Sequence, residues 1–420
     1  MKAPRIVRQD ESVRVVVRTP AELFEEGKDD KGRYAGGKWG GLYLRAPDIY
    51  FRILEKAGDK LVRLGDVAEV RFGIKTGANE FFYLEPLELT VKDVAELRER
   101  DPKAPVRVRN GSGWEGEIEA AWLRPVLKSP REIRTIRVRL EDLRHLVFIP
   151  PHDVREAIEA GGSSPLERYP QAAAYIEWGE RAVYVCQRHG CKYRSENPVC
   201  PRHGSGDIKR DALPERSSLA SRPRWWDLGE REPAQVNCNY LLDDRMYFYF
   251  AQGGVYVSDN FQELHGGDGI TAALASVSVT QLWNELGGRT PFGGGLLKVQ
   301  TYEVARLAIL NPAALTPIQH QHLLSTFERL SQREVKSIFE ELGFPLCHQR
   351  RCSHPEHPYE HVHPESLTLE QIQKASPDRF ELDRVVFDVL GLTDEERLET
   401  YRAVARLVKD RLTKAMSNNN

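Results

Sequence analysis

The stretch RLGDVAEVRFGIKTGANEFFYL (63–84) joins two strand-like runs through a polar turn. The surrounding chain also alternates short strand-like runs with turns. The two runs of this stretch, LGDVAEVRFGI and EFFYL, carry β-branched and aromatic residues bounded by glycine and asparagine, which predicts short strands. Gly73 and Gly77 allow a close backbone approach to a partner. Lys75, Thr76 and Asn79 can donate hydrogen bonds to phosphates or base edges. For Asn79, a simple turn-forming role is the alternative.

Strand-like runs continue outward from this stretch as far as residue 315. Examples are VNCNYLLDDRMYFYFA (236–251) and GVYVSDN (254–260), whereas residues 91–100 and 271–286 have the spacing of helices. The mixture predicts an α+β fold, with a short-stranded, mixed-sheet domain over residues 61–315. Cys238 lies within one of the predicted strands, where we expect it to be a small buried hydrophobe.

The chain after residue 315 has a helical pattern, so we expect a small helical unit over residues 316–420. Apolar residues recur at helical spacing near the end, at Leu398, Tyr401, Ala405, Val408 and Leu412. Capping patterns predict three helix starts, at Thr316 followed by Pro317, at Ser331 with Glu334, and at Thr393 with Glu396. The first 60 residues read as a linker or tail, with a Gly-rich loop at 28–41.

A cysteine cluster interrupts the predicted strand domain at CQRHGCKYRSENPVCPRHG (186–204). Zinc prefers thiolate and imidazole ligands, and closely spaced pairs let one tight turn present two of them. The predicted ligands are Cys186, Cys191, Cys200 and His203, with His189 as the alternative fourth. Such a site is closed and therefore structural, and we expect a zinc knuckle inserted over residues 181–206. The other interpretation is a set of incidental surface cysteines.

A second cluster, CHQRRCSHPEHPYEHVH (347–363), falls inside the predicted helical unit. Only four of its side chains could bind one metal ion, and the predicted set is Cys347, Cys352, His354 and His357. A solvated His-rich loop is the alternative. An open metal site for nuclease chemistry is a weaker hypothesis, because the acidic residues that such chemistry needs are not at hand.

Composition limits the classes of function that fit this chain. It has 420 residues, 40% of them hydrophobic and 29% charged, and a net charge of −2. No run approaches the roughly 18 apolar residues of a membrane span, and we expect a cytoplasmic protein with reduced thiols. Positive charge is nevertheless concentrated: residues 181–224 hold ten Lys/Arg and four Asp/Glu, a balance of +6. That island is typical either of a phosphate-contacting surface or of a solvated face.

Four segments carry a family resemblance, and they occur in the family's order. The stretch 63–84 resembles the opening of the target-recognition region in adenine-specific DNA methyltransferases of the combined restriction–modification type. KWGGLYLRAPDIYF (38–51) is similar to the segment that joins their catalytic and recognition domains. SRPRWWDLGE (221–230) resembles their arginine–aromatic segment, and GGGLLKVQTYEVARLAILNP (293–312) the strand and loop that close the recognition region.

The resemblance implies binding of double-stranded DNA by a recognition region. On that basis we expect DNA contacts from charged and polar residues of the turn and of the arginine–aromatic segment: Lys75, Thr76, Asn79, Arg222, Arg224, Trp225 and Trp226. For the tryptophans, plain core packing is the alternative.

The catalytic motifs of that family are missing from this sequence. The family uses a tetrapeptide Asn/Asp/Ser-Pro-Pro-Tyr/Phe/Trp beside the flipped adenine, whereas the one Pro-Pro pair here lies in Ile149-Pro150-Pro151-His152. We therefore expect a recognition portion that is inactive alone and meets S-adenosylmethionine only through a partner or missing catalytic domain. The alternative function is a zinc-stabilised protein-interaction scaffold in a defence complex.

Overall fold

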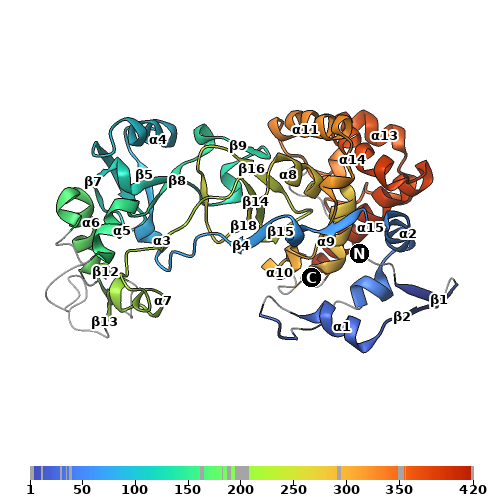
Figure 1. The fold of residues 1–420 in the computed structure, drawn as a ribbon, viewed down its shortest axis with the longest axis horizontal. Coiled ribbons are helices and arrows are strands. Elements are labelled where there is room, and N and C mark those ends of the chain that lie inside the picture. The colour runs from blue at the N-terminus through green and yellow to red at the C-terminus, as the bar shows by residue number, and fades with distance from the viewer. Residues whose placement is uncertain are drawn as a thin grey trace.

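The computed structural model describes residues 4–10, 13–28, 31–34, 36, 40–160, 165–181, 183–186, 191–193, 208–290, 295–348, 354 and 356–417. These residues form two lobes, each built around a sheet of its own (Figure 1). We call them the helical lobe, on the right of the view, and the strand lobe, on the left. The fold is α+β with mixed sheets, as the sequence predicted.

The helical lobe contains a five-stranded sheet in the order β4-β18-β14-β16-β9. Neighbouring strands are antiparallel except β9, which runs parallel to β16. Cys238 in the central strand is 0% exposed, which confirms its expected role as a small buried hydrophobe. The strands are β4 (Glu69–Phe72), β9 (Arg137–Val138), β14 (Val236–Asn239), β16 (Phe248–Ala251) and β18 (Phe261–His265).

Helices from distant parts of the chain complete this lobe (Figure 1). They are α2 (Asp48–Ala57), α8 (Gly269–Ala275), α9 (Ser278–Gly287), α10 (Thr301–Val304), α11 (Pro317–Gln332), α12 (Ile338–Glu341), α13 (Leu369–Ala375), α14 (Pro377–Leu390) and α15 (Asp394–Ser417). Helices α8 and α10 lie against the sheet, whereas α2, α13 and α15 pack on other helices. Two short strand pairs complete the lobe: β3 (Leu61–Arg63) with β20 (Ala308–Leu310), and β15 (Leu241–Leu242) with β19 (Leu297–Lys298). An N-terminal arm adds β1 (Arg5–Gln9), β2 (Arg14–Val17) and α1 (Pro20–Gly27).

The strand lobe contains a six-stranded sheet in the order β17-β8-β10-β5-β6-β7. Its pairs are antiparallel except β17 with β8. The strands are β5 (Tyr83–Pro86), β6 (Pro105–Asn110), β7 (Glu115–Glu119), β8 (Leu123–Leu127), β10 (His145–Phe148) and β17 (Tyr256–Val257). The helices are α3 (Asn79–Phe82), α4 (Val91–Arg100), α5 (His152–Glu159), α6 (Pro170–Glu180) and α7 (Ser217–Ala220). A three-stranded sheet of β11 (Val183–Cys186), β12 (Lys192–Tyr193) and β13 (Ile208–Asp211) lies beside α6 and α7 (Figure 1).

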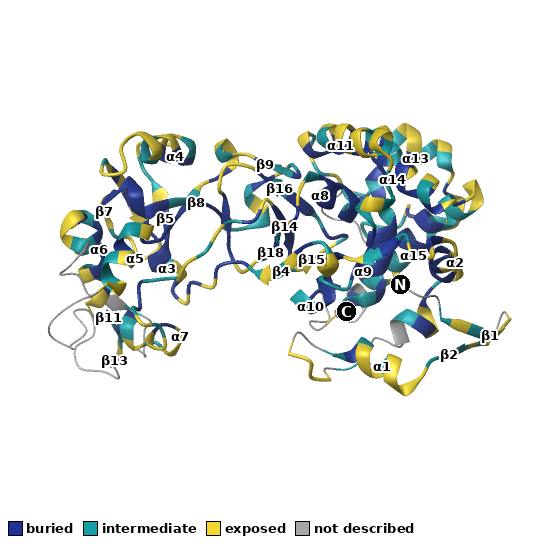
Figure 2. Ribbon diagram, viewed as in Figure 1, coloured by how far each residue is buried: buried dark blue, intermediate teal, exposed yellow. Residues whose placement is uncertain are grey.

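The core of the helical lobe crosses both domain boundaries expected from the sequence, at 60 and at 315. Ile53 of α2, Leu274 of α8, Phe387 of α14 and Val404 of α15 are all at most 2% exposed and belong to one apolar cluster. Figure 2 shows this buried interior running through the lobe. Burial of such large apolar side chains is the main stabilising term in folding, so residues 42–57 and the C-terminal helices fold together with the five-stranded sheet.

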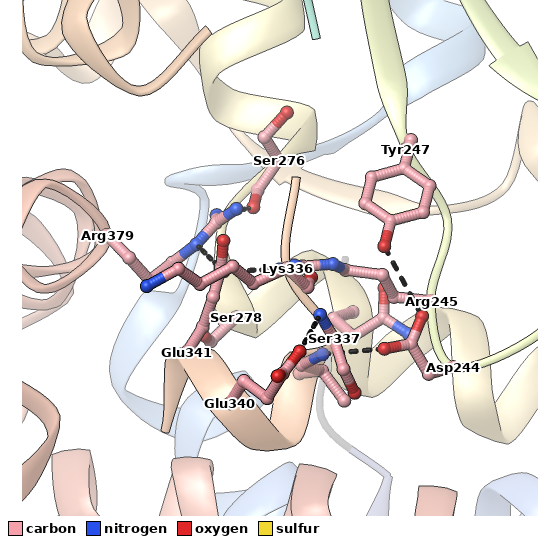
Figure 3. A network of polar contacts seen from close by, with 12 residues as sticks. Asp244, Arg245, Tyr247, Ser276, Ser278, Lys336, Ser337, Glu340, Glu341 and Arg379 are labelled. Atoms are coloured by element: carbon pink, nitrogen blue, oxygen red, sulfur yellow. Dashed lines mark hydrogen bonds and ion pairs between the residues drawn. The ribbon is translucent and has the colours of Figure 1, made fainter. Parts of the chain in front are cut away.

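A buried charge network also joins the sheet to the C-terminal helices (Figure 3). Glu341 of α12, 2% exposed, accepts from Arg245 Nη1 at 2.5 Å and from Arg379 Nε at 3.1 Å through the same oxygen, Oε2. Its other oxygen accepts from Arg333 Nη2 at 2.7 Å. Burial alone raises the pKa of Glu341, but the surrounding guanidinium groups outweigh burial and hold this pKa far below its usual value.

Two of the three predicted helix starts are confirmed. Thr316 caps α11 with Pro317 in the first turn, and the Thr393 and Glu396 side chains exchange bonds with each other's backbone N–H. The third is wrong, because α11 continues through Ser331 to Gln332. The next helix, α12, begins instead after Ser337, which forms the capping box with Glu340. Among the described residues, no helix is both long and apolar enough to cross a membrane.

Candidate functional site

The candidate site is the turn of residues 73–79, which we call the recognition turn. It leaves the helical lobe at the end of β4 and enters the strand lobe at α3. Gly73 and Ile74 donate backbone bonds to the carbonyl oxygens of Phe261 (3.1 Å) and Val257 (2.8 Å). A Cβ atom on Gly73 would lie 2.1 Å from the Ser258 carbonyl oxygen, so this position needs glycine. The turn is therefore anchored at the junction of the two sheets.

The polar residues of the recognition turn have different exposures. Thr76 is 1% exposed; its hydroxyl contacts the Asn79 carboxamide and accepts from the Ala78 N–H at 3.2 Å. Lys75 and Asn79 are exposed, and the Lys75 ammonium lies 4.1 Å from the centre of the Phe72 ring. Gly77 adopts a φ of 73°, which favours glycine. The turn thus presents Lys75 and Asn79 to solvent and uses Thr76 internally.

Arg222 connects the recognition turn to the arginine–aromatic segment. Its Nη2 donates to the carbonyl oxygens of Lys75 at 3.0 Å and Thr76 at 2.9 Å, and its Nη1 donates to the Trp225 carbonyl at 3.4 Å. Burial lowers the pKa of the Arg222 guanidinium below its usual value, while Asp227 raises it. Ser218 of α7 adds a bond from its hydroxyl to the Gly77 carbonyl at 3.3 Å. Two segments about 145 residues apart in sequence are thereby held together.

The two tryptophans of that segment belong to the core of the strand lobe. Trp225 and Trp226 are 8% and 7% exposed. Trp225 packs against Phe81 at 4.8 Å between ring centres and donates its indole N–H to Glu180 at 3.3 Å, and Trp226 lies 5.8 Å from Trp122. Their rings are covered by protein, so this placement favours the packing role that the sequence left open over stacking on bases.

The arginines near the recognition turn are largely paired with acids. Arg224 lies 3.4 Å from Asp227, with its guanidinium over the Trp226 ring. Arg216 contacts Asp211 at 2.7 Å and Glu80 at 2.5 Å. The hydrogen bond to Asp211 raises the pKa of Arg216. Among the described part of the basic island, much of the formal excess of positive charge is therefore neutralised locally.

The first two predicted zinc ligands lie at the closed end of a hairpin. β11 ends at Cys186 and β12 begins one residue after Cys191, and the Cys186 N–H donates to the Cys191 carbonyl at 2.9 Å. Ile208 of β13 pairs with Cys186 from the other side. Cys200, His203 and the alternative ligand His189 lie outside the described residues. Antiparallel pairing thus brings Cys186 and Cys191 together.

The second cluster is arranged differently from the predicted set. The ligand atoms of Cys347, His357 and Glu360 all lie within 4.8 Å of one another. His354 is exposed, and its Nδ1 accepts from the Glu356 N–H at 3.1 Å. Cys352 lies outside the described residues. Sequence reasoning missed Glu360, although its spacing of three residues from His357 was a usable signal.

Another contact that sequence reasoning missed involves Arg231. Its guanidinium donates to the Phe72 carbonyl at 3.4 Å, at the end of β4, and its own carbonyl accepts from the Tyr256 hydroxyl at 2.8 Å. Arg231 thus supports the start of the recognition turn from the segment that returns to the helical lobe. The contact depends on long-range packing, so no local pattern could have indicated it.

No protein-family model matches this chain, and none of the curated proteins matches it. Solved structures that match this chain include the type IIG restriction endonuclease BpuSI, at 15% sequence identity and a TM-score of 0.39 over 85% of this chain and 34% of that one. Another is the type IIL restriction-modification enzyme MmeI in complex with DNA, at 13% sequence identity and a TM-score of 0.39. This match covers 82% of this chain and 36% of that one. This chain spans about a third of the length of each.

Proposed function

We propose that this chain is the DNA-binding target-recognition portion of an adenine-specific, S-adenosylmethionine-dependent DNA methyltransferase. The observation that carries the proposal is the bond pattern of Arg222, which fixes the carbonyl groups of Lys75 and Thr76. Two segments that resemble one recognition region, 63–84 and 221–230, therefore form one structural unit. That unit presents an exposed cation and an exposed carboxamide, the two kinds of side chain that such a surface needs.

The proposed roles of the two exposed residues follow from their chemistry. The Lys75 ammonium is a flexible point charge suited to a phosphate, where it adds affinity without reading sequence. The Asn79 carboxamide can donate from Nδ2 to adenine N7 in the major groove and can accept from adenine N6 with the Oδ1 lone pair that the Thr76 hydroxyl does not use, at about 1–3 kcal/mol of discrimination. Thr76, Arg222 and the tryptophans position the turn, because their polar groups and rings contact protein.

Methyl transfer itself is assigned to a separate polypeptide or domain. The family's catalytic tetrapeptide is absent from these 420 residues, so the flipped adenine and S-adenosylmethionine would be held by that partner. In this arrangement the present chain recognises the DNA sequence, and the partner catalyses methyl transfer.

We further propose that zinc stabilises the hairpin inserted in the strand lobe. Cys186 and Cys191 fit such a site, since their backbones close the same hairpin, and paired ligands on a tight turn suit tetrahedral zinc. Cys200 and His203 would complete it, because the chain reaches β13 only five residues after His203 and β13 pairs with Cys186. Bound zinc would order a short basic segment that has few apolar residues of its own.

Selection from a random duplex library tests the proposal. The full chain should enrich duplexes that share a short adenine-containing sequence, and Asn79→Ala should bind DNA while losing preference at one position of that sequence. Lys374→Ala, on an exposed part of α13, serves as the control and should enrich the same sequence as the wild type. Recovery of a random population by the wild-type chain at low salt would contradict target recognition.

A further inference from the structure

The loop between α12 and α13 contains a group of potential metal-binding side chains outside the recognition turn. Cys347 follows α12, and His357 and Glu360 precede α13; their ligand atoms lie within 4.8 Å of one another. In tetrahedral zinc sites with bonds of about 2.0–2.3 Å, neighbouring ligand atoms are roughly 3.5 Å apart. Side-chain adjustments of about 1 Å would therefore suffice to place all three around one ion.

The backbone of this loop holds the three side chains together. The Cys347 N–H donates to the Pro358 carbonyl at 3.1 Å, so the two ends of the loop run side by side. The Tyr359 ring packs 5.2 Å from Phe339 of α12, and Val362 is fully buried. Lys409 of α15 donates to the Val362 carbonyl at 3.0 Å and pairs with Glu356 at 2.9 Å. The loop is thus fastened to α12 and α15 on either side of the cluster.

The electrostatics of the group also suit a divalent cation. A thiolate and a carboxylate together carry two negative charges, which Zn²⁺ balances, while neutral imidazole adds none. His357 Nδ1 is 3.9 Å from a Glu360 oxygen, beyond hydrogen-bond distance, and it has no hydrogen-bond partner among the described residues. Glu360 is 9% exposed at its side chain, so its charge is largely withdrawn from water.

We propose that Cys347, His357 and Glu360 bind one zinc ion in the C-terminal part of the chain. The sulfur ligand disfavours magnesium and calcium, which take oxygen ligands, and the mixed sulfur, nitrogen and oxygen set is one that zinc accepts. Glu360 takes the place that sequence analysis gave to His354. This site is independent of the hairpin cysteines and of the proposed recognition of DNA.

The ion would link the end of α12 to the segment that leads into α13. Within that span Leu342, Phe344, Val362 and Leu367 are buried in the apolar cluster of the helical lobe, and a metal ion would add a crosslink to this packing. α12 also carries Glu341, the acceptor for three guanidinium groups. Zinc at Cys347 would therefore restrain the helix on which that buried network depends.

Metal content of full-length chains tests the proposal without reference to DNA. The background is the double variant Cys186→Ser plus Cys191→Ser, which removes the hairpin site. This background should retain about one zinc ion per chain by mass spectrometry. Adding Glu360→Gln or His357→Ala should release it, since neither replacement is a good zinc ligand. Adding His361→Ala should not, because His361 is exposed and lies outside the cluster.

Cobalt reconstitution provides a second readout that does not depend on zinc retention during purification. The background chain loaded with Co²⁺ should show a thiolate-to-metal absorption band that disappears in Cys347→Ser, with circular dichroism unchanged. Glu360→Gln should weaken Co²⁺ binding at least tenfold while keeping the band at saturation. A background chain that binds neither metal, or a Glu360→Gln chain that keeps full zinc content, would overturn the assignment.

Discussion

Arg222 is the residue on which the shape of the recognition turn depends most. Its guanidinium donates to three backbone carbonyls, of Lys75, Thr76 and Trp225. Arg222→Ala leaves those carbonyls without their partner, and hydrogen bonds from a charged group contribute about 1.5–3 kcal/mol. We expect a loss of this order in the free energy of unfolding, measured with urea, and weaker binding to every duplex. Arg222→Lys should recover only part, because an ammonium lacks the guanidinium fork; full recovery would contradict the account.

Lys75 is expected to act on affinity alone. Its ammonium is exposed and lies over the Phe72 ring, so Lys75→Ala should lower the free energy of unfolding by no more than about 0.5–1 kcal/mol. Binding should weaken equally for all duplexes, and the slope of log affinity against log salt should fall by about one. A change in the preferred sequence, rather than in the slope, would show that Lys75 reads bases.

Sequence patterns predicted a turn at residues 73–79 as the candidate site but could not rank its side chains. Gly73 and Gly77 were recognisable because close approach and a positive φ require glycine. Whether Thr76 faces solvent depends on how Asn79 and Ala78 pack around it. The spacing of residues in the sequence does not predict that packing. The tryptophans illustrate the same limit, since an Arg-Trp-Trp segment is compatible with either a surface or a core.

Among the elements, the cysteine hairpin of β11 and β12 makes the clearest prediction. Cys186→Ser or Cys191→Ser should release about one zinc ion per chain and make residues 181–224 more sensitive to protease, because this segment has little core of its own. The matched control for zinc content is Cys238→Ser, which changes a buried cysteine of β14 outside both Cys/His clusters. Zinc analysis of the wild-type chain that finds no metal would end the hypothesis.

Helix starts were predictable where an N-cap residue directly precedes the first residue of a helical apolar repeat. Thr316 meets that condition, and its capping box with Gln319 is present. Ser331 does not, because it is fully buried within α11 and its hydroxyl donates to the Glu328 carbonyl. The same capping pattern stands six residues later, at Ser337 and Glu340, so spacing alone could not choose between the two.

At the scale of the whole molecule, Glu341 ties the five-stranded sheet to the C-terminal helices. Its pKa is depressed in the folded chain, so its contribution to stability is complete above the unfolded value of about 4.5 and is lost as the pH falls below it. Glu341→Gln leaves buried guanidinium groups without their anion and should cost about 3–5 kcal/mol near neutral pH. The variant should also lose less stability than the wild type as the pH falls from about 4.5 to about 2.5, measured by urea unfolding.

The control for that variant is Glu370→Gln, an exposed carboxylate on α13. It should match the wild type in both stability and pH dependence. Equal acid sensitivity of Glu341→Gln and the wild type would show that this carboxylate does not control the acid-side loss of stability.

The general α+β class was readable from the sequence, whereas the extent of the core was not. The sequence correctly predicted that the strands lie before residue 315 and that the described elements after it are helical. However, α2 packs against α14 and α15, and one apolar cluster runs from Tyr43 to Leu412. Local periodicity does not indicate contacts between residues more than 300 positions apart. The predicted division into a tail, a domain and a helical unit was therefore made without these contacts.

The central claim is that this chain holds duplex DNA through a surface centred on the recognition turn. Fluorescence anisotropy of a labelled duplex, titrated with the full chain over a series of salt concentrations, tests it most directly. The account predicts binding that weakens steeply and linearly in log–log form as salt rises, with a shallower slope for Lys75→Ala and the wild-type slope for Lys374→Ala. Absence of binding at the lowest salt, with or without a methyltransferase catalytic domain, would contradict it.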